Sequence, residues 1–426
     1  MRTYEPEATT AERRRRRKPG LRRRVAASLA IFGLAILGTV PMTAPAATAA
    51  SSPVNICMIG ALSGPFTELG LYDGQGAVAW AKYLNKHGGL LGHQVKLTKE
   101  DDHSDPATAA SLVRKCVTQD HANFIFGPEE TATAAAGIPV INQLKTVAIV
   151  WESGWAGQGV TGSQLTGYAF PSITNVFHAD DQAFVQKLVA PRHLKRVAVI
   201  QDNAPGGLGN DKYTASLGKK YGFKMVASQT VTPGSTDDTP AVLKLMRAHP
   251  QAIVLGMIPG TDTITALKAI RAQSPNIPIG ECSGCALPAF VKAAGGYATM
   301  KNVYIIGTPQ QLADSLPRTK ANMPVINDTK QYLSAMKAAG LSTENDLDQS
   351  SAGWDTGIEL QTAVKAANSL DTSKVRTAMT HEKVAVGGLF GQFYQRTPQN
   401  YENIVRLVSV MSVLKPNGKV AVFSAG

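Results

Sequence analysis

Charged residues are scarce in this chain of 426 residues. Asp, Glu, Lys and Arg together make up 17% of it, whereas hydrophobic residues make up 44%. An average globular protein has about 25% charged residues, and disordered chains combine high charge with low apolar content. The composition therefore excludes disorder for most of the chain and predicts a large buried core. Because single cores stop growing at about 250 to 300 residues, two domains are expected rather than one.

Excess basic charge is also missing once the first 50 residues are set aside. The formal net charge is +12, but residues 1–50 hold ten Lys and Arg against three acids, which leaves 33 basic and 28 acidic residues. A nucleic-acid-binding protein needs a concentrated basic surface. The near balance after residue 50 therefore argues against a nucleic-acid partner.

No apolar run reaches the length of a typical membrane span. Residues 25–40 are 16 uncharged, largely apolar residues that follow a basic run and precede the small residues 46–50. A spanning helix needs about 20 apolar residues, whereas this order is typical of a secretory signal peptide. We expect a signal peptide over residues 1–50, cleaved near Ala49 or Ala50, and a mature protein secreted outside the cytoplasm, in the periplasm or cell-wall space. A retained anchor and a twin-arginine signal at residues 22–24 are the alternatives.

Cysteines number only four. Cys282 and Cys285 form a CxxC pair, which can be a redox couple, half a metal site or a short disulfide. Zinc would need two more Cys or His ligands at compatible spacing, and none stands nearby, so a local disulfide is favoured. Cys57 lies in an expected strand and Cys116 on the apolar side of an expected helix, where buried free thiols are the ordinary outcome. A bridge between these two cysteines is the alternative, and only coordinates can decide it.

Catalytic and cofactor motifs are missing as well. The sequence has no HExxH, no GxxxxGK[ST] and no GxSxG elbow, and the glycine-rich residues 60–64 do not match GxGxxG. The acidic residues 100–105 lack the central glycine and terminal glutamate of a calcium loop. These absences predict a protein that is not an enzyme and has no cofactor and no metal site.

What the chain does contain is an alternation of β-branched runs and helical patterns. Strands separated by helical stretches predict parallel sheets covered on both faces, the α/β class. The expected strands are 54–60, 95–99, 123–126, 146–150, 196–201, 224–230, 252–257 and 303–306, with a closing strand region at 404–413. The expected helices are 74–86, 107–117, 179–188, 211–221, 239–248, 261–272, 326–339 and 353–367. Because these strands are too many for one five-stranded sheet, we divide the chain at the helix-free, turn-rich residues 170–172.

Two turns have a purely structural explanation. Asp105 precedes Pro106, so a capping carboxylate stands before a proline at the first helical position. The glycines of residues 88–92 tolerate positive φ and end one helix before the next strand.

Candidate binding loops follow the expected strands, because open α/β sheets bind ligands at the carboxyl ends of their strands. Helix N-termini after several of these loops offer free N–H groups suited to an anion, so a carboxylate ligand is expected. The loops are residues 63–65, 127–131 and 152–155 in the first series and 202–203, 259–261 and 280–281 in the second.

Five segments in register resemble the substrate-binding proteins of branched-chain amino-acid (leucine, isoleucine, valine) ABC importers. They are residues 59–65, Gly70, residues 85–92, residues 101–106 and the Gly127 turn, and the resemblance extends over most of residues 53–426. It implies a type I periplasmic-binding fold: two doubly wound parallel-sheet lobes joined by a three-stranded hinge, without catalysis. It places lobe 1 at 53–171 with about 310–385, and lobe 2 with the hinge at 172–309 with about 386–426. The implied partners are a small-molecule ligand and an ABC transporter permease at the membrane.

The resemblance also implies a ligand site. In the family a hydroxyl residue and backbone amides hold the ligand carboxylate, and these match Thr131 and residues 153–155. For Ser63, a turn-shaping role and ligand contact are equally supported. For Trp354 and Trp151, packing in the core and contact with the ligand are equally supported. The candidate ligand-binding residues are Ser63, Leu69, Thr131, Ser153, Gly154, Trp155, Asp202, Glu281 and Trp354.

The sequence departs from the amino-acid binders where the ligand ammonium is held. The family's tyrosines are replaced near Gly206 and Pro259, and Glu281 is the only stand-in for the family's acid. Burying an unpartnered ammonium would cost several kcal/mol. We therefore expect a small carboxylate-bearing solute, amino acid-like and either aromatic or aliphatic, rather than leucine itself. A ligand-sensing or scavenging module without a transporter is the alternative function, and a hydrolase is a less favoured one.

Overall fold

The computed structural model describes residues 52–423 except 65–66, 152–166, 173–175, 204–206, 233, 258–260, 281–287, 342–346, 389–390 and 402–403. The signal-peptide prediction for residues 1–50 and the disulfide prediction for Cys282 and Cys285 lie outside the described residues.

The first sheet is parallel throughout and has the order β2-β1-β3-β4-β5. Its strands are β1 (Val54–Gly60), β2 (Val95–Asp101), β3 (Phe124–Phe126), β4 (Ala148–Val150) and β5 (Ala169–Pro171). Their residues are almost all apolar in β1, β3 and β4, as expected of strands buried on both faces. The last strand, β5, ends in Pro171, which an edge strand tolerates because one side has no partner.

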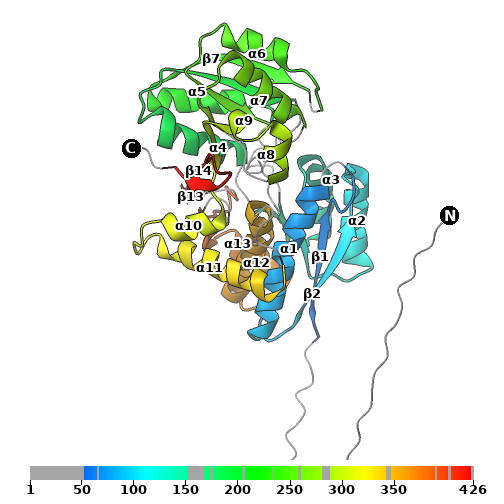
Figure 1. Cartoon of the computed structure of the whole chain (residues 1–426). Helices are drawn as coiled ribbons and strands as arrows, with labels where there is room; N and C mark the ends of the chain where they lie inside the picture. The colour runs from blue at the N-terminus through cyan, green and yellow to red at the C-terminus, as the bar shows by residue number, and fades with distance from the viewer. Residues whose placement is uncertain are drawn as a thin grey trace, which may run out of the picture. The chain divides into compact units, whose positions relative to one another are not determined.

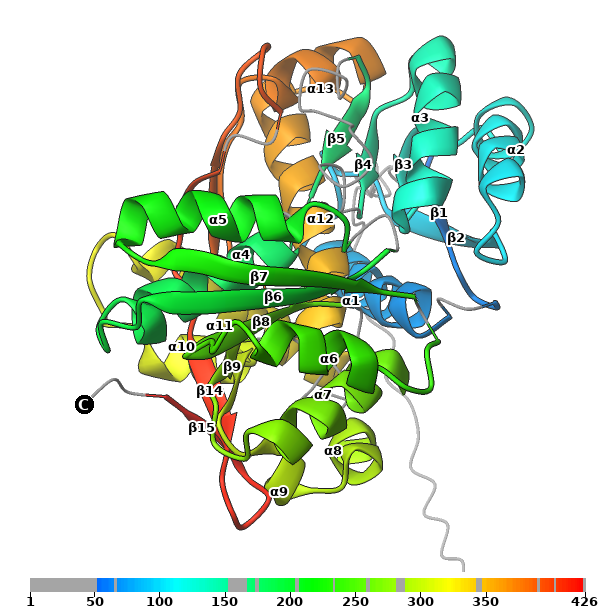
Figure 2. The same cartoon turned by 90° about the horizontal axis from the view of Figure 1, so that it is seen from above.

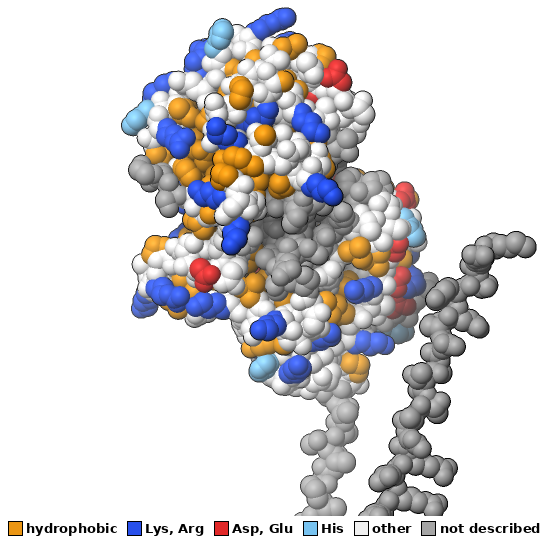
Figure 3. Space-filling view, in the orientation of Figure 1, with side chains coloured by type: hydrophobic (Ala, Val, Ile, Leu, Met, Phe, Trp, Pro, Cys, Tyr) orange, Lys and Arg blue, Asp and Glu red, His pale blue; other side chains and the backbone are white. Residues whose placement is uncertain are grey.

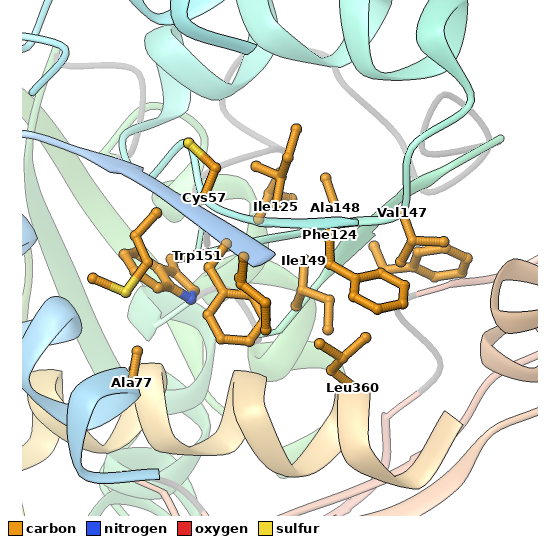
Figure 4. Packing of buried hydrophobic residues seen from close by; sticks show 14 of the residues in the cluster. Cys57, Ala77, Phe124, Ile125, Val147, Ala148, Ile149, Trp151 and Leu360 are labelled. Atoms are coloured by element: carbon orange, nitrogen blue, oxygen red, sulfur yellow. The ribbon is translucent and has the colours of Figure 1, made fainter. Parts of the chain in front are cut away.

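Helices cover both faces of this sheet (Figure 1). They are α1 (Thr67–Lys86), α2 (Pro106–Thr118), α3 (Thr131–Leu144), α11 (Met323–Ala338), α12 (Leu347–Ala367) and α13 (Thr372–Met379). Side chains alternate between the two faces, since successive strand residues point in opposite directions. Figure 4 shows Cys57, Ile125 and Ala148 on one side of the sheet, and Phe124 and Ile149 on the other, toward Leu360 of α12.

The second sheet has seven strands in the order β15-β14-β10-β9-β8-β6-β7. Five strands are parallel: β6 (Arg196–Asp202), β7 (Lys224–Val231), β8 (Ala252–Gly256), β9 (Ile279–Gly280) and β10 (Val303–Ile306). The other two, β14 (Met411–Leu414) and β15 (Val420–Val422), are antiparallel and come from the end of the chain. The C-terminal segment thus completes a sheet that begins more than 200 residues earlier.

Two apolar clusters cover the two faces of this second sheet. Ala198 and Ile200 of β6 belong to one cluster, and Val197 and Val199 belong to the other. The strict alternation is the period-two pattern of a strand buried on both sides. Figure 2 shows α5 on one side of β6 and β7 and α6 with α7 on the other. The helices of this half are α4 (Val176–Phe184) with a π-helical turn (Val185–Val189), α5 (Asn210–Tyr221), α6 (Thr239–Met246), α7 (Thr261–Gln273), α8 (Pro288–Ala294) and α9 (Tyr297–Met300).

A third, antiparallel sheet follows β10 and precedes β14 in the sequence. Its three strands are β11 (Lys383–Val386), β12 (Gln392–Gln395) and β13 (Ile404–Leu407). The helix α10 (Pro309–Ser315) precedes α11 and packs with it through Leu312 and Val325. The α/β prediction with parallel sheets is therefore confirmed, with antiparallel strands added at the edge of the second sheet.

Three predictions about local structure have clear outcomes. The Asp105 cap is confirmed, since its carboxylate accepts a hydrogen bond from Thr108 N at 2.7 Å and Pro106 begins α2. The turn-rich reading of residues 170–172 is wrong in part, because Phe170 and Pro171 pair with β4. The expectation of free thiols at Cys57 and Cys116 is also wrong. Cys57 in β1 and Cys116 in α2 face each other with Cα atoms 6.0 Å apart, a separation suited to the disulfide that joins them.

Glycines let α1 and α12 approach closely. A Cβ on Gly353 would lie 1.9 Å from Asp73 O, and one on Gly76 would lie 1.7 Å from Ser350 O. A third, on Gly357, would lie 2.2 Å from the Trp80 ring. The backbones of the two helices therefore touch, and no larger residue fits between them without moving one helix.

We predict that Gly353→Ala lowers the free energy of unfolding by about 2 to 3 kcal/mol, because the added methyl overpacks this crossing. Gly74→Ala is the matched control in α1, since its Cβ would meet only ordinary contacts at 3.7 Å or beyond. The control should be neutral or up to about 1 kcal/mol stabilising, as Ala favours helices over Gly. Urea titration of both variants tests this, and equal stabilities would refute the close crossing.

Candidate functional site

The described residues that follow β1, β2 and β3 gather at one edge of the first sheet. These strands are parallel and in register, so that Gly60 lies opposite Asp101 and Met58 opposite Phe126. The residues that follow each strand therefore emerge together at the carboxyl-terminal edge, where such sheets bind ligands. We call this region the first-sheet edge.

Gly127 directs the chain from β3 into α3 at this edge. Its φ is +91°, and a Cβ there would lie 2.1 Å from Ile59 O of β1. Only glycine combines this backbone conformation with such a close approach. The turn brings Glu129, Glu130 and Thr131 to the start of α3.

Glu130 caps α3 with its own carboxylate. Glu130 Oε2 accepts hydrogen bonds from Ala132 N at 2.8 Å and Thr133 N at 3.2 Å, and Glu130 N donates to Thr133 Oγ1. Burial raises the pKa of Glu130, and the two backbone hydrogen bonds partly offset this. Two of the free N–H groups at the start of α3 are thus already occupied. Sequence reasoning missed this cap because Glu is not among the preferred N-cap residues.

Thr131, the predicted hydroxyl anchor, is the first residue of α3 and is 4% exposed. Among the described residues its hydroxyl has no hydrogen-bond partner. This oxygen is not among the fully buried polar atoms that lack a partner, so solvent reaches it. The role of Thr131 in ligand binding stays a prediction.

Ser63 follows β1 and is hydrogen-bonded to Asp101, the last residue of the neighbouring strand β2. Ser63 Oγ donates to Asp101 Oδ2 at 2.8 Å, while Leu62 N and Ser63 N donate to Asp101 Oδ1 at 3.0 and 3.1 Å. His103 Nδ1 lies 2.5 Å from Ser63 Oγ and 3.0 Å from Asp101 Oδ2. Because the hydroxyl proton is committed to Asp101, the geometry favours the turn-shaping role for Ser63.

Asp102 follows directly and is 1% exposed. Its Oδ1 accepts a hydrogen bond from Ser104 N at 2.9 Å, whereas its Oδ2 has no partner among the described residues. Burial, together with the nearby carboxyls of Asp101 and Glu130, raises the pKa of Asp102 to about 6. The sequence placed Asp102 among the acidic residues 100–105, and nothing in the sequence indicated that it is buried.

Two glycines make room for a further carboxylate at this edge. The side chain of Glu129 is 3% exposed, and its Oε2 lies 2.9 Å from where a Cβ on Gly60 would stand and 2.6 Å from one on Gly70. The glycines that carried the family resemblance therefore have a physical reason: they border a buried acid.

The remaining predicted site residues divide into three groups. Trp354 is fully buried in the core of the first half, and its Nε1 donates to Asp328 Oδ1 at 3.1 Å, which favours core packing. Asp202 ends β6, 1% exposed, with the backbone of Gly207 against its carboxylate. Leu69 lies in α1, but its side chain is outside the described part of the structure, as are Ser153, Gly154, Trp155 and Glu281.

Buried hydrogen bonds tie the segment after β5 to β12. Tyr394 of β12 donates to Ser172 O, and Arg396 donates to Pro171 O. Arg396 also pairs with Glu359 of α12, at 2.7 Å, and with Glu382. Burial raises the pKa of both Glu359 and Glu382 despite this pairing.

Asp328 of α11 is a second buried acid near this region. Its Oδ2 accepts a hydrogen bond from Gly387 N at 2.6 Å, just after β11, and its Oδ1 accepts from Trp354. Burial raises its pKa to about 6, although both hydrogen bonds act in the opposite direction. The side chain is 8% exposed, so this carboxyl is held by donors rather than by water.

Other kinds of site find no support in the described part of the chain. No group of three or more His, Cys, Asp or Glu there has a metal-binding arrangement, and none of its helices is long and apolar enough to span a membrane. Lys and Arg side chains lie scattered over the face drawn in Figure 3 and form no continuous basic stripe.

Comparisons with known proteins agree with this architecture. A family model described as periplasmic binding protein matches residues 53–414. An amino acid binding protein of Pseudomonas aeruginosa is 25% identical over 341 residues, covering 78% of this chain and 86% of its own length. The Leu/Ile/Val-binding protein of Escherichia coli K12 is 23% identical over 354 residues, covering 80% and 90%. An ABC transporter substrate-binding protein from Sphaerobacter thermophilus has a TM-score of 0.71 at 17% identity, covering 88% of this chain and 97% of its own, which shows a shared fold.

The pKa of Asp328 gives a prediction for stability against pH. A carboxyl with a pKa raised from 3.8 to about 6 binds its proton more tightly in the folded state, so its contribution is present at low pH and is lost as the pH rises through this window. In the wild type this carboxyl should lower the free energy of unfolding by about 3 kcal/mol as the pH rises from 4 to 6. Asp328→Asn should remove this decrease. Urea titrations at pH 4 to 7 measure it. The exposed Asp314→Asn is the control, and parallel profiles for wild type and Asp328→Asn would contradict the assignment.

Proposed function

We propose, from the premise that this chain belongs to the periplasmic binding protein family, that it is the extracytoplasmic solute-binding protein of an ABC importer. The observation that carries the proposal is the match of the family model to residues 53–414, nearly the whole described range. The family consists of solute-binding proteins and is non-enzymatic. Its members are extracytoplasmic, which accords with the signal peptide expected at residues 1–50.

In this proposal a small organic solute is enclosed between the two α/β halves. The halves are lobe 1 and lobe 2 as divided above, with connecting segments at residues 171–172 and around β12 and β14. Binding of the solute stabilises the closed arrangement of the two halves over the open one, and the membrane permease recognises the closed arrangement. The second parallel sheet offers a binding edge of its own at Asp202 and Gly256.

The proposed solute is small, amino acid-like and carboxylate-bearing, as the resemblance implies. The hydroxyl of Thr131 contributes to its binding, because Thr131 begins α3 at the first-sheet edge and the resemblance implies a hydroxyl residue there. Burying about 200 Å² of apolar ligand surface would contribute roughly 5 kcal/mol before the costs of association. With two or three polar contacts this suffices for micromolar binding.

A ligand screen with a shape measurement tests the proposed function. We expect at least one compound among amino acids, aromatic acids and short fatty acids to raise the melting temperature, and the same compound to lower the radius of gyration in solution scattering. Loss of uptake of that compound on deletion of the gene would assign the import role. Binding without any effect on uptake would favour the sensing or scavenging alternative, and turnover of the compound would favour a hydrolase.

We predict that Thr131→Val weakens binding of the solute found in that screen about tenfold or more, because a buried polar contact is lost and the shape is kept. Titration calorimetry measures the affinity. Thr118→Val is the control, since Thr118 Oγ1 is in α2 and donates only to Arg114 O within the same helix. Unchanged affinity in Thr131→Val would remove this residue from the site.

A further inference from the structure

A hollow far from the first-sheet edge lies between the ends of three helices. The helix α1 follows β1 and ends before β2, so its last residues lie at the opposite end of the first half from that edge. Two adjoining cavities of about 420 and 270 Å³ open there between α1, α11 and α12. Tyr83 and His87 line both cavities. We call the two cavities together the helix-end groove.

Contacts between and within the helices hold this groove in shape. Lys82 Nζ of α1 donates a hydrogen bond to Ala339 O, at the end of α11, at 3.3 Å. The rings of Tyr83 and His87 stack with their centroids 4.1 Å apart, and His87 Nδ1 donates to Tyr83 O at 2.7 Å. The close crossing of α1 and α12 described above fixes the third helix. The groove is therefore formed by packed helices rather than by loops.

Lysines border the groove, and acids do not. Lys82 and Lys86 line one cavity, and Lys365 lines the other. Lys86 and Lys365 are exposed and form no ion pair within the described residues. Figure 3 shows blue and pale-blue side chains at the lower end of the molecule, where α1 ends in Figure 1. The chain segments that surround the groove contain seven Lys and no Asp or Glu: residues 74–99, 329–341 and 360–370.

Acids that flank these segments in the sequence do not offset this charge. Asp73, Asp328 and Glu359 are buried, Glu100 pairs with Lys115, and Asp371 caps α13. Lysines in the last turns of α1 and α12 also suit the negative end of a helix dipole. The dipole accounts for one lysine on each helix, but not for the lack of acids in all three segments or for the hollow between them.

The turn after α1 adds an exposed apolar side chain beside the groove. Gly89 of this turn lines the larger cavity. Leu91 is 37% exposed and has a φ of +52°, a conformation that bulky residues rarely adopt. Next to it, His93 Nδ1 donates to Ser52 O at 2.8 Å, so the described chain begins at this same end. The signal peptide expected at residues 1–50 is therefore joined to the folded part here.

We propose that the helix-end groove binds a phosphate-bearing organic anion, and that the source of this anion is the headgroup of an acidic phospholipid, with Leu91 at the membrane interface. Phosphate oxygens accept several charge-assisted hydrogen bonds, which ammonium groups donate. Gln331 and Thr362 add uncharged hydrogen-bonding groups to the lining.

Two observations favour a lipid over a soluble phosphate. An exposed leucine beside a group of lysines is the combination that rests on an anionic membrane surface, because apolar burial and charge attraction act together. The end of the molecule that carries them is also the end joined to the membrane-directed signal peptide. The inference does not depend on which solute is bound between the two halves.

Vesicle binding tests the inference. The chain Ser51–Gly426, which forms a compact unit by itself, is sedimented with vesicles of phosphatidylcholine alone or with about one third phosphatidylglycerol. We expect binding to the anionic vesicles only, and we expect it to weaken at ionic strengths above about 0.15 M, where salt screens the charges. Equal binding to both kinds of vesicle, or binding to neither, would overturn the inference.

The triple variant Lys82→Gln, Lys86→Gln and Lys365→Gln tests the groove itself. Glutamine keeps a hydrogen-bond donor on a flexible side chain but removes the charge. We expect the affinity for anionic vesicles to fall at least about tenfold, with the melting temperature little changed. An unchanged affinity would overturn the assignment to this groove.

A second triple variant is the matched control: Lys219→Gln, Lys244→Gln and Lys268→Gln in the second half. Lys219 and Lys244 also lie in the last turns of helices, and Lys268 Nζ also donates to a carbonyl of a neighbouring helix, Ala293 O, at 3.1 Å. The net charge changes by the same amount, so vesicle binding should be retained. An equal loss in both triple variants would show attraction by net charge alone and would overturn the site.

Leu91→Asn and a soluble ester separate the two sources of phosphate. Asn tolerates the left-handed backbone conformation but offers no apolar contact, so the affinity for vesicles should fall about threefold or more. Unchanged vesicle affinity in this variant would overturn the placement of Leu91 at the interface. Titration calorimetry with glycerol 3-phosphate is the other arm. Binding of this ester without any binding to vesicles would overturn the lipid source.

Discussion

The buried guanidinium of Arg396 is the interaction on which the arrangement of the chain depends. It pairs with Glu359 of α12 and Glu382, donates to Tyr401 O at 2.8 Å, and donates to Pro171 O. A charge removed from water is tolerated only when its donors are satisfied, and here the guanidinium donates four hydrogen bonds, two to carboxylates and two to carbonyls. The segment that leaves the first sheet is therefore held against β12, a segment that follows it by more than 200 residues. Tyr394 adds a second attachment, because its hydroxyl donates a hydrogen bond to Ser172 O.

This attachment fixes the segment at the end of the first sheet to β12. Residues 171–172 and β12 are joined by hydrogen bonds in a dry environment, so they behave as one unit, and the closure proposed above would have to occur beyond them. Asp328 acts similarly nearby by joining α11 to Gly387 and Trp354. These carboxyls have pKa values raised by burial, which costs stability at neutral pH. An apolar cluster of the same volume would not fix the direction of the strands as hydrogen bonds do. Our hypothesis is that charged groups are kept there because their hydrogen bonds specify one arrangement of these strands.

The sequence predicted the elements with strong patterns and missed those with weak ones. The bounds of β1 and β10 were predicted to the residue, because both are continuous apolar runs between turns. The helix α3 was missed, since its interior holds Pro139 and its cap is a glutamate. The strands β5, β11 and β12 have three or four residues each, which is too short for an alternation of apolar and polar residues to be recognised. The Cys57–Cys116 bridge needed coordinates, because the facing of β1 and α2 sets the distance between the two thiols.

The position of the candidate site at the first-sheet edge could be predicted from the sequence, but the charge on its buried groups could not. Parallel strands with polar loops predict a candidate site at the first-sheet edge, and Thr131 is a candidate residue because the resemblance implies a hydroxyl residue at that position. The orientation of Glu130 could not be read, since an acid at a helix start is as consistent with solvent exposure as with capping. The same two hydrogen bonds that begin α3 also fix a carboxylate among the loops of the first-sheet edge, so a substitution of Glu130 changes helix stability and local charge together. An isosteric change from Glu to Gln separates the two effects, because it removes the charge and retains an oxygen that can cap the helix.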